Sequence, residues 1–144
     1  MSGILTAESG TPFSVLMSCA DINAEGDNCR PNRIASGALP SGQQSINGWF
    51  NTAAFVIPST PEYGDAGRNI LRSPGLNDID VAMSKWFPWG SVETRRLQIR
   101  SEFFNALNHT NLGVPVNSID SPAFGTITTS QPGREIQFGA RLEF

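Results

Sequence analysis

The sequence predicts an all-β protein, built from antiparallel strands and one long irregular loop. Three segments of about ten residues alternate between apolar and polar side chains, which is the period of a β-strand. Glycine and proline occur 14 and 10 times in 144 residues, and both favour turns over regular structure. No apolar run approaches the roughly 20 residues that a membrane-spanning helix needs. The net charge of −3 at pH 7 leaves no basic stripe, so we expect no nucleic-acid partner.

Residues 1–17 are expected to form a strand pair, SGILTAES and FSVLMS, separated by the break GTP. Residues 18–75 carry Gly, Pro, Asn, Asp and Ser throughout and lack sustained periodicity, which predicts one long loop. An apolar island, WFNTAAFVI at 49–57, is either a helical turn or a docked segment. Structureless loops of this length are uncommon in compact domains, so the loop either has a function or has lost a supporting partner.

Residues 76–144 are expected to supply the C-terminal antiparallel strands. The strand LNDIDVAMSKWF is followed by the turn PWGSVE at 88–93, and the strands RLQIRSEF and EIQFGARLEF complete the set. Within each strand the apolar residues share one parity, and they are Ile79, Val81, Met83, Phe87, Leu97, Ile99, Phe103, Ile136, Phe138, Ala140, Leu142 and Phe144. Each strand therefore has one apolar face.

The opposite parity of these strands is charged, through Asp78, Asp80, Arg96, Arg100, Glu102, Arg141 and Glu143. Because these residues recur along the strands, we expect a ladder of cross-strand ion pairs, each worth about 0.2–1 kcal/mol. A convergent acid–base site is not expected.

Two architectures fit this alternation. A β-sandwich would bury the apolar faces and expose the polar ones to water. An outer-membrane barrel would turn the apolar faces to lipid and the polar ones to its interior. Basic, acidic and amide side chains at neighbouring levels suit a hydrated interior, and the strand lengths match a tilted bilayer crossing. We therefore favour the barrel, with interfacial aromatic girdles formed at strand ends by Trp86, Phe87, Trp89 and Phe144.

Several blocks together resemble the C-terminal end of TonB-dependent receptors. They are SGTPFSV, WFNTAAF, GDAGRNILRSPGLNDIDVAMSKWF, LQIRSEFFNALNHTNLG, SPAFGTIT and GREIQFGARLEF, and they span nearly the whole chain. The closest likeness is to the carboxypeptidase-regulatory-domain-bearing receptors of soil bacteria. Members of that family have a barrel of about 22 strands, an N-terminal plug and a periplasmic box that contacts the energy-coupling protein. They import large nutrients such as metal chelates or glycans.

The resemblance implies a location in the bacterial outer membrane and a place for each segment. Residues 18–75 become a long extracellular loop, PWGSVE a periplasmic turn and HTNLGVPVNSIDSPAFG a second outer loop, since outer loops in such barrels are the long ones. Phe144 resembles the terminal aromatic residue that the barrel-assembly machinery recognises.

The chain shows only four or five strand candidates, whereas single-chain barrels need at least eight. It also carries no plug and no coupling box, and its first residues resemble no secretory signal. We therefore expect a piece of a longer protein, an incomplete barrel whose partners are the rest of the parent barrel, outer-membrane lipid or other copies of itself. The alternative is a stand-alone β-protein from a truncated receptor that assembles into an oligomer or fibre.

Two cysteines lie ten residues apart in the long loop. In an exported protein Cys19 and Cys29 are expected to form a disulfide. The intervening segment matches part of a calcium loop, through Asp21, Asn23 and Glu25. The twelfth position is Asn32 instead of a bidentate glutamate, so an ordinary polar loop is favoured.

No motif predicts catalysis or a cofactor. His109 is the single histidine, and no G-x-S-x-G or S-x-x-K motif accompanies it. Its expected role is a loop hydrogen bond, and a small hydrolase is the least favoured alternative. The segment GDAGRNILRSPG resembles an anion cradle only weakly, because no helix with a P-loop pattern follows. Arg68 and Arg72 are instead expected to tie this loop to the strand carboxylates.

Overall fold

The computed structural model describes residues 1–22, 29–88 and 95–144. The chain divides into two compact units that alternate along the sequence. The sheet unit comprises Met1–Glu8, Leu76–Asn111 and Gln131–Phe144, and the core unit comprises Ser9–Gly75 and Leu112–Ser130. These boundaries differ from the expected segments, because the first segment divides at Ser9 and part of the last segment joins the core unit.

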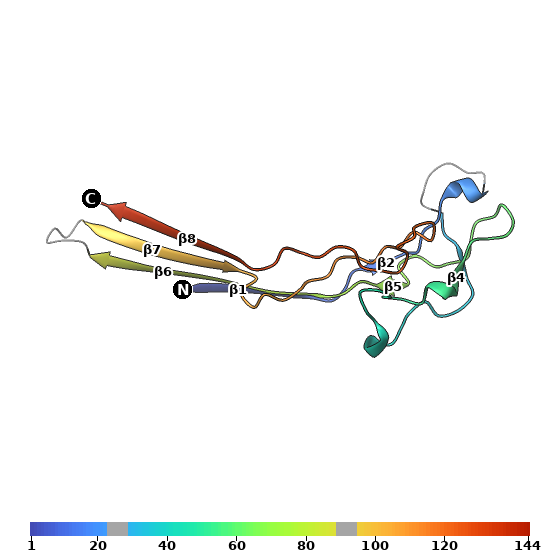
Figure 1. Ribbon diagram of the computed structural model, residues 1–144, viewed down its shortest axis with the longest axis horizontal. Coiled ribbons are helices and arrows are strands. Elements are labelled where there is room, and N and C mark those ends of the chain that lie inside the picture. The colour runs from blue at the N-terminus through green and yellow to red at the C-terminus, as the bar shows by residue number, and fades with distance from the viewer. Residues whose placement is uncertain (23–28, 89–94) are drawn as a thin grey trace. The chain divides into compact units, whose positions relative to one another are not determined.

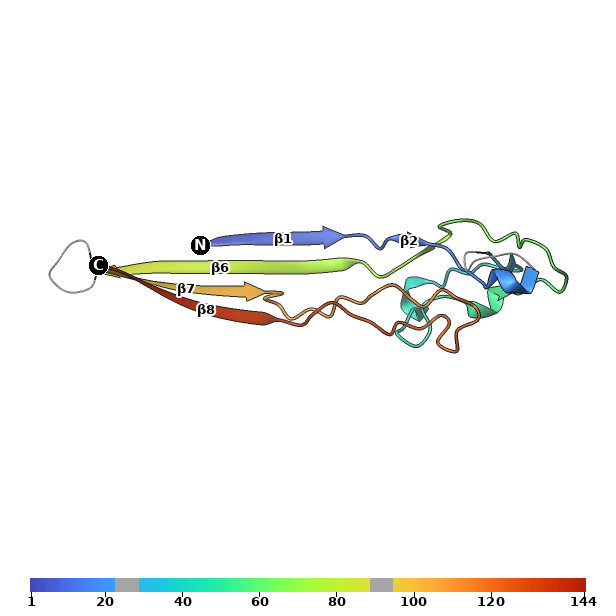
Figure 2. The same cartoon turned by 90° about the horizontal axis from the view of Figure 1, so that it is seen from above.

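The sheet unit is one four-stranded antiparallel sheet in the order β1-β6-β7-β8 (Figure 2). Its strands are β1 (Ser2–Glu8), β6 (Leu76–Pro88), β7 (Arg96–Phe104) and β8 (Glu135–Glu143). The expected all-β class with antiparallel strands is confirmed, since the described residues contain no α-helix and only three short 3₁₀ helices. No helix in the described ranges is long and apolar enough to cross a membrane.

The strand register places most of the apolar residues of neighbouring strands on one side of the sheet. Val81 pairs with Phe103, which pairs with Ile136, whereas Ala82 pairs with Glu102, which pairs with Gln137. Residues directly opposite in an antiparallel pair project to the same side. The parity read from the sequence therefore gives the sheet one apolar face, formed by Leu5, Ala7, Ile79, Val81, Met83, Phe87, Leu97, Ile99, Phe103, Ile136, Phe138, Ala140 and Leu142.

The core unit contains the larger of the two buried hydrophobic clusters of the described residues. Phe50 is its centre, with ring centroids 5.7 Å from Phe13, 6.0 Å from Phe55 and 5.2 Å from Phe124. Regular structure is sparse, namely the strand pairs β2 (Pro12–Phe13) with β5 (Leu71–Arg72) and β3 (Asn32–Arg33) with β4 (Phe55–Val56), and the helices η1 (Cys19–Ile22), η2 (Ser41–Gln43) and η3 (Thr52–Ala54), as Figure 1 shows in part.

Residues 18–75 are thus irregular in backbone, as expected, yet most of them belong to a packed unit. The island at 49–57 forms η3 and then β4, and it buries Phe50, Ala54 and Phe55. Its partners, Phe13 and Leu71, lie far away in the sequence. Burial therefore comes from long-range contacts, which local periodicity does not report.

Candidate functional site: a sheet with two unlike faces

The apolar face of the sheet is exposed. Phe138 is 73% exposed and Ile99 is 41% exposed, although both lie in the middle of regular strands. Other exposed large side chains on this face are Leu5, Met83, Phe87, Ile136 and Leu142. Contiguous apolar patches of this kind are rare on soluble monomers and indicate a surface that meets protein or membrane. The sandwich alternative required these side chains to be buried in a core, and the structure contradicts it.

The opposite face, here called the polar face, carries a band of aromatic and charged side chains across three strands. The guanidinium carbon of Arg96 lies 5.3 Å from the ring centroid of Trp86. Arg96 Nη2 also lies 3.1 Å from Glu143 Oε2, and Arg141 Nη2 lies 3.1 Å from Glu143 Oε1. One carboxylate therefore holds two guanidinium groups, and the band connects β6, β7 and β8.

The ion pairs depart from the expected cross-strand ladder. Within the described residues only Arg96–Glu143 crosses between strands, because Arg141–Glu143 and Arg100–Glu102 join residues two apart on one strand. The register explains the difference. Arg100 lies between Ser84 and Gly139, and Glu102 lies between Ala82 and Gln137, so neither has an opposite charge directly across.

Asp78 and Asp80 form no ion pair in the described part of the chain, which corrects their assignment to the ladder. Their neighbours on β1 are Thr6 and Ile4, neither of which is basic. Asp80 Oδ1 instead accepts a hydrogen bond from the Asn105 backbone N–H at 3.0 Å. It fixes the backbone where β7 ends.

The expected aromatic girdle is only partly on the apolar face. Phe87 lies there, but Trp86 pairs with Gln98 on the polar face, because adjacent residues of a strand point to opposite sides. Trp89 lies outside the described residues. Lys85 also occupies the apolar face, and its Nζ lies 5.1 Å from the Phe87 ring centroid, nearer to the strand end. A lysine can in this way hold its ammonium group away from the centre of an apolar surface.

At the end of the sheet where β6 begins and β7 ends, three asparagines, Asn105, Asn108 and Asn111, hold the backbone. This group is called the asparagine corner. The Asn111 side-chain amide bonds both backbone groups of Asn77, accepting from its N–H at 2.9 Å and donating to its C=O at 2.9 Å. The Asn105 side chain bonds both backbone groups of His109 at 2.9 Å. Asn105 and Asn108 have φ of 48° and 53°, a region that asparagine tolerates better than most residues. Sequence reasoning missed this corner, although asparagine recurs every third residue in NALNHTN.

His109 belongs to this corner. Its Nδ1 lies 3.0 Å from Asn111 Oδ1, and its backbone is held by Asn105. A hollow of about 300 Å³ adjoins the corner and is lined partly by Asp78, Asp80 and Glu135. Among the described residues no three His, Cys, Asp or Glu side chains are grouped as metal ligands. The arrangement fits loop bracing, the role expected for His109 from the sequence.

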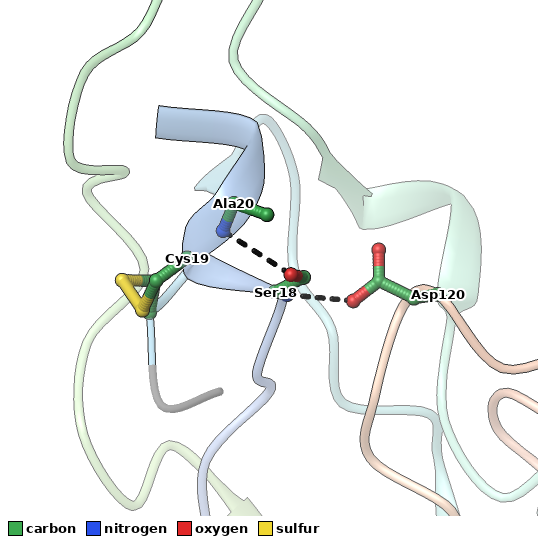
Figure 3. The surroundings of a disulfide bond; sticks show 5 residues. Ser18, Cys19, Ala20 and Asp120 are labelled. Atoms are coloured by element: carbon green, nitrogen blue, oxygen red, sulfur yellow. Dashed lines mark hydrogen bonds between the residues drawn. A yellow bond between two sulfur atoms is a disulfide. The ribbon is translucent and has the colours of Figure 1, made fainter. Parts of the chain in front are cut away.

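Cys19 and Cys29 form a disulfide with a Cα–Cα distance of 5.2 Å (Figure 3). Both residues are buried against Met17. Beside the bridge the Ser18 N–H donates to Asp120 Oδ2 at 2.7 Å, and the Ala20 N–H donates to Ser18 Oγ at 3.2 Å. Of the weak calcium-loop candidates, Asn23 and Glu25 lie outside the described residues, and only the backbone of Asp21 is described, in η1.

Replacing both cysteines with alanine is expected to lower the free energy of unfolding of the core unit by about 2–3 kcal/mol, because the bridge closes a short loop in the unfolded chain. Urea titration monitored by tryptophan fluorescence measures the loss. Dithiothreitol should destabilise the wild-type chain by a similar amount and leave the double variant unchanged. Equal stability of the reduced and oxidised wild-type chain would contradict the prediction.

The expected tie between the strand carboxylates and Arg68 or Arg72 stays a prediction, because it would join the two units. Arg72 Nη1 donates to the Gly10 carbonyl at 3.0 Å, and the Arg72 carbonyl accepts from Trp49 Nε1 at 2.8 Å. Arg68 makes no side-chain hydrogen bond or ion pair with described residues. Both arginines lie in the core unit, whereas Asp78 and Asp80 lie in the sheet unit.

The family model described as an outer membrane beta barrel domain matches residues 1–137. Searches of curated proteins and of solved structures returned no match.

Proposed function

The chain belongs to the outer membrane beta barrel domain family, and from this premise we propose that it forms the C-terminal wall of a TonB-dependent receptor for nutrient uptake. The apolar face then contacts lipid, and the polar face lines the interior. The role is structural, and no chemical step is assigned to any residue.

The observation that carries the proposal is the register of β6, β7 and β8. This register places the apolar side chains of three strands on one exposed face. It places the band of aromatic and charged side chains, Trp86, Arg96, Arg141 and Glu143, on the opposite face. A water-soluble sheet needs its apolar face covered, whereas a barrel wall needs it bare. The receptor class rests on the sequence blocks that resemble TonB-dependent receptors.

The connections between strands support an extracellular position for residues 18–75. In the antiparallel sheet, β1 and β7 end and β6 and β8 begin at the same end, from which the two long connections start. The short connection 89–95 joins β6 and β7 at the other end. Outer-membrane barrels place long loops outside and short turns in the periplasm. The Cys19–Cys29 disulfide also fits an oxidising compartment.

The partners implied are the remaining strands of the barrel, outer-membrane lipid and the barrel-assembly machinery. β1 and β8 are the edges of the described sheet and offer their outer backbone groups to further strands. Phe144 follows β8 and is 92% exposed, which leaves it accessible as an assembly signal. No nucleic-acid partner is implied.

Site-directed spin labelling tests the orientation of the sheet. Single cysteines at Ile136, Phe138 and Ala140 should be accessible to oxygen in lipid vesicles, and cysteines at Gln137 and Gly139 to a water-soluble nickel chelate. The native cysteines do not compete for label, because they are joined to each other. Accessibility that does not alternate along β8 would rule out a barrel wall.

The receptor class is tested by the reading frame that surrounds the chain. A plug domain and a coupling box are expected upstream of residue 1. If the reading frame encodes neither a plug domain nor a coupling box, the chain belongs to another class of outer-membrane protein. This conclusion would hold even if the spin labels on β8 alternate in accessibility as expected.

A second candidate function is self-assembly as a stand-alone β-protein. The observation that favours it is the pair of open edges, β1 and β8, beside a large exposed apolar face. Size-exclusion chromatography in plain buffer and in detergent separates the candidates. A species of fixed size in plain buffer favours self-assembly, and dependence on detergent favours the barrel wall.

A further inference from the structure

The core unit contains a hollow whose lining includes two arginine side chains. Its volume is about 530 Å³, and the described residues that line it are Ser14, Leu16, Arg30, Arg68 and Asn117. We propose that this hollow binds a small organic molecule through an oxyanion group, a carboxylate or a phosphate. The inference does not depend on the receptor proposal, because all five residues belong to the core unit.

The two guanidinium groups are the first reason. Within the described ranges neither Arg30 nor Arg68 makes a side-chain hydrogen bond or an ion pair, whereas Arg72 is bonded to Gly10 and Arg96 to Glu143. Arg30 is half-buried, and Arg68 is exposed. Two positive charges on the lining of one hollow favour an anion there. Guanidinium groups match carboxylate and phosphate oxygens in geometry.

The backbone around Arg30 is held by a disulfide and by hydrogen bonds, so the position of the Arg30 Cα is fixed. Cys29 precedes it in the disulfide, and the Cys29 carbonyl accepts from the Met17 N–H at 2.7 Å. The Arg30 carbonyl accepts from the Gly64 N–H at 3.1 Å. A Cβ at Gly64 would lie 2.2 Å from the Arg30 oxygen, so only glycine permits this approach.

Ser14 connects the remaining lining residues. Its Oγ accepts from the Asn69 N–H at 2.8 Å, next to Arg68, and its carbonyl accepts from Asn117 Nδ2 at 2.7 Å. The Asn117 carbonyl in turn accepts from the Leu16 N–H at 2.9 Å. Since Oγ acts as the acceptor toward Asn69, the hydroxyl proton remains able to donate. The hollow is therefore lined by donors on a hydrogen-bonded frame, and such preorganisation lowers the cost of binding.

The size and lining suggest the class of ligand. A volume of about 530 Å³ lies within the roughly 300–1,000 Å³ typical of small-molecule sites. Leu16 supplies an apolar wall for a carbon skeleton, and Arg30, Arg68 and Ser14 supply donors for the oxyanion. Among the described lining residues, none carries a negative charge.

Isothermal titration of the full chain in detergent micelles tests the proposal, with citrate and inorganic phosphate as probes. We expect binding at one site per chain that weakens as salt is raised. Arg30→Gln and Arg68→Gln should each weaken binding roughly tenfold, as expected for loss of a charge-assisted hydrogen bond. The matched control is Arg33→Gln, which removes an exposed arginine of the same unit that does not line the hollow.

The outcomes are distinguishable. Tighter binding of citrate assigns a carboxylate ligand, and tighter binding of phosphate assigns a phosphate ligand. Absence of binding by both probes, or an equal loss in Arg33→Gln, would overturn the site. If Arg30→Gln fails to fold, amide chemical-shift changes in the wild-type chain decide the question, because binding must perturb Leu16, Arg68 and Asn117 and leave the β6–β8 amides unperturbed.

Discussion

Phe138→Arg is expected to destabilise the membrane-inserted sheet by about 2–4 kcal/mol, the cost measured for arginine near the midplane of a barrel's lipid face. Phe138 lies on the apolar face, in register with Ser101 of β7 and at the level of Met83 of β6. Met83 is near the middle of β6, so the new guanidinium would enter the lipid far from either surface. Urea titration of the protein folded in lipid vesicles measures the free energy of unfolding.

Gln137→Arg is the matched control for this change. It adds the same side chain one residue away on β8, but on the polar face opposite Glu102. Its effect is expected to stay within about 0.5 kcal/mol, as for most exposed substitutions. Equal destabilisation by the two substitutions would mean that the faces of the sheet do not meet different solvents, and the barrel-wall account would then be wrong.

Phe50→Ala should destabilise the core unit by about 3–5 kcal/mol, the usual range for removing a buried phenylalanine. Phe50 is 3% exposed and contacts the rings of Phe13 and Phe124, which lie far away in the sequence, and of Phe55 in its own segment. Its removal therefore leaves a cavity where these segments converge. Urea titration monitored by tryptophan fluorescence measures the loss.

Ile34→Ala provides the comparison in the same unit. Ile34 is 66% exposed, so its truncation should change stability by no more than about 0.5 kcal/mol. A Phe50 variant as stable as this control would show that residues 9–75 have no cooperative core. They would then be the loosely ordered loop that their composition suggests.

The sheet could be predicted from the sequence because strand periodicity is local. Ile99 and Arg100 point to opposite faces whichever strands surround them, so parity alone assigned both faces correctly. The family match over residues 1–137 bears out the outer-membrane barrel as the fold family. Trp86, expected in the interfacial girdle together with Phe87, pairs with Gln98 on the polar face, because adjacent residues of a strand point to opposite sides.

The core unit and the ion-pair partners could not be predicted, because both depend on which distant residues meet. Phe13, Phe50 and Leu71 share no period, and only the tertiary fold brings them together. Likewise, the charge of Arg100 was evident, but its neighbours Ser84 and Gly139 follow from the register. The register also leaves Asp80 beside Ile4, and Asp80 therefore bonds a backbone N–H instead of an arginine.

In the proposed barrel wall, Lys85 and the asparagine corner lie at the two membrane–water interfaces. At a rise of about 3.4 Å per residue and a tilt of roughly 40°, a hydrocarbon layer about 25 Å thick takes about ten residues of strand. Counted along β6 from Phe87, beside the Lys85 ammonium, that distance ends at Asn77. There the side-chain amide of Asn111 bonds both the N–H and the C=O of Asn77. The backbone groups of β6 at this membrane surface therefore already have hydrogen-bond partners.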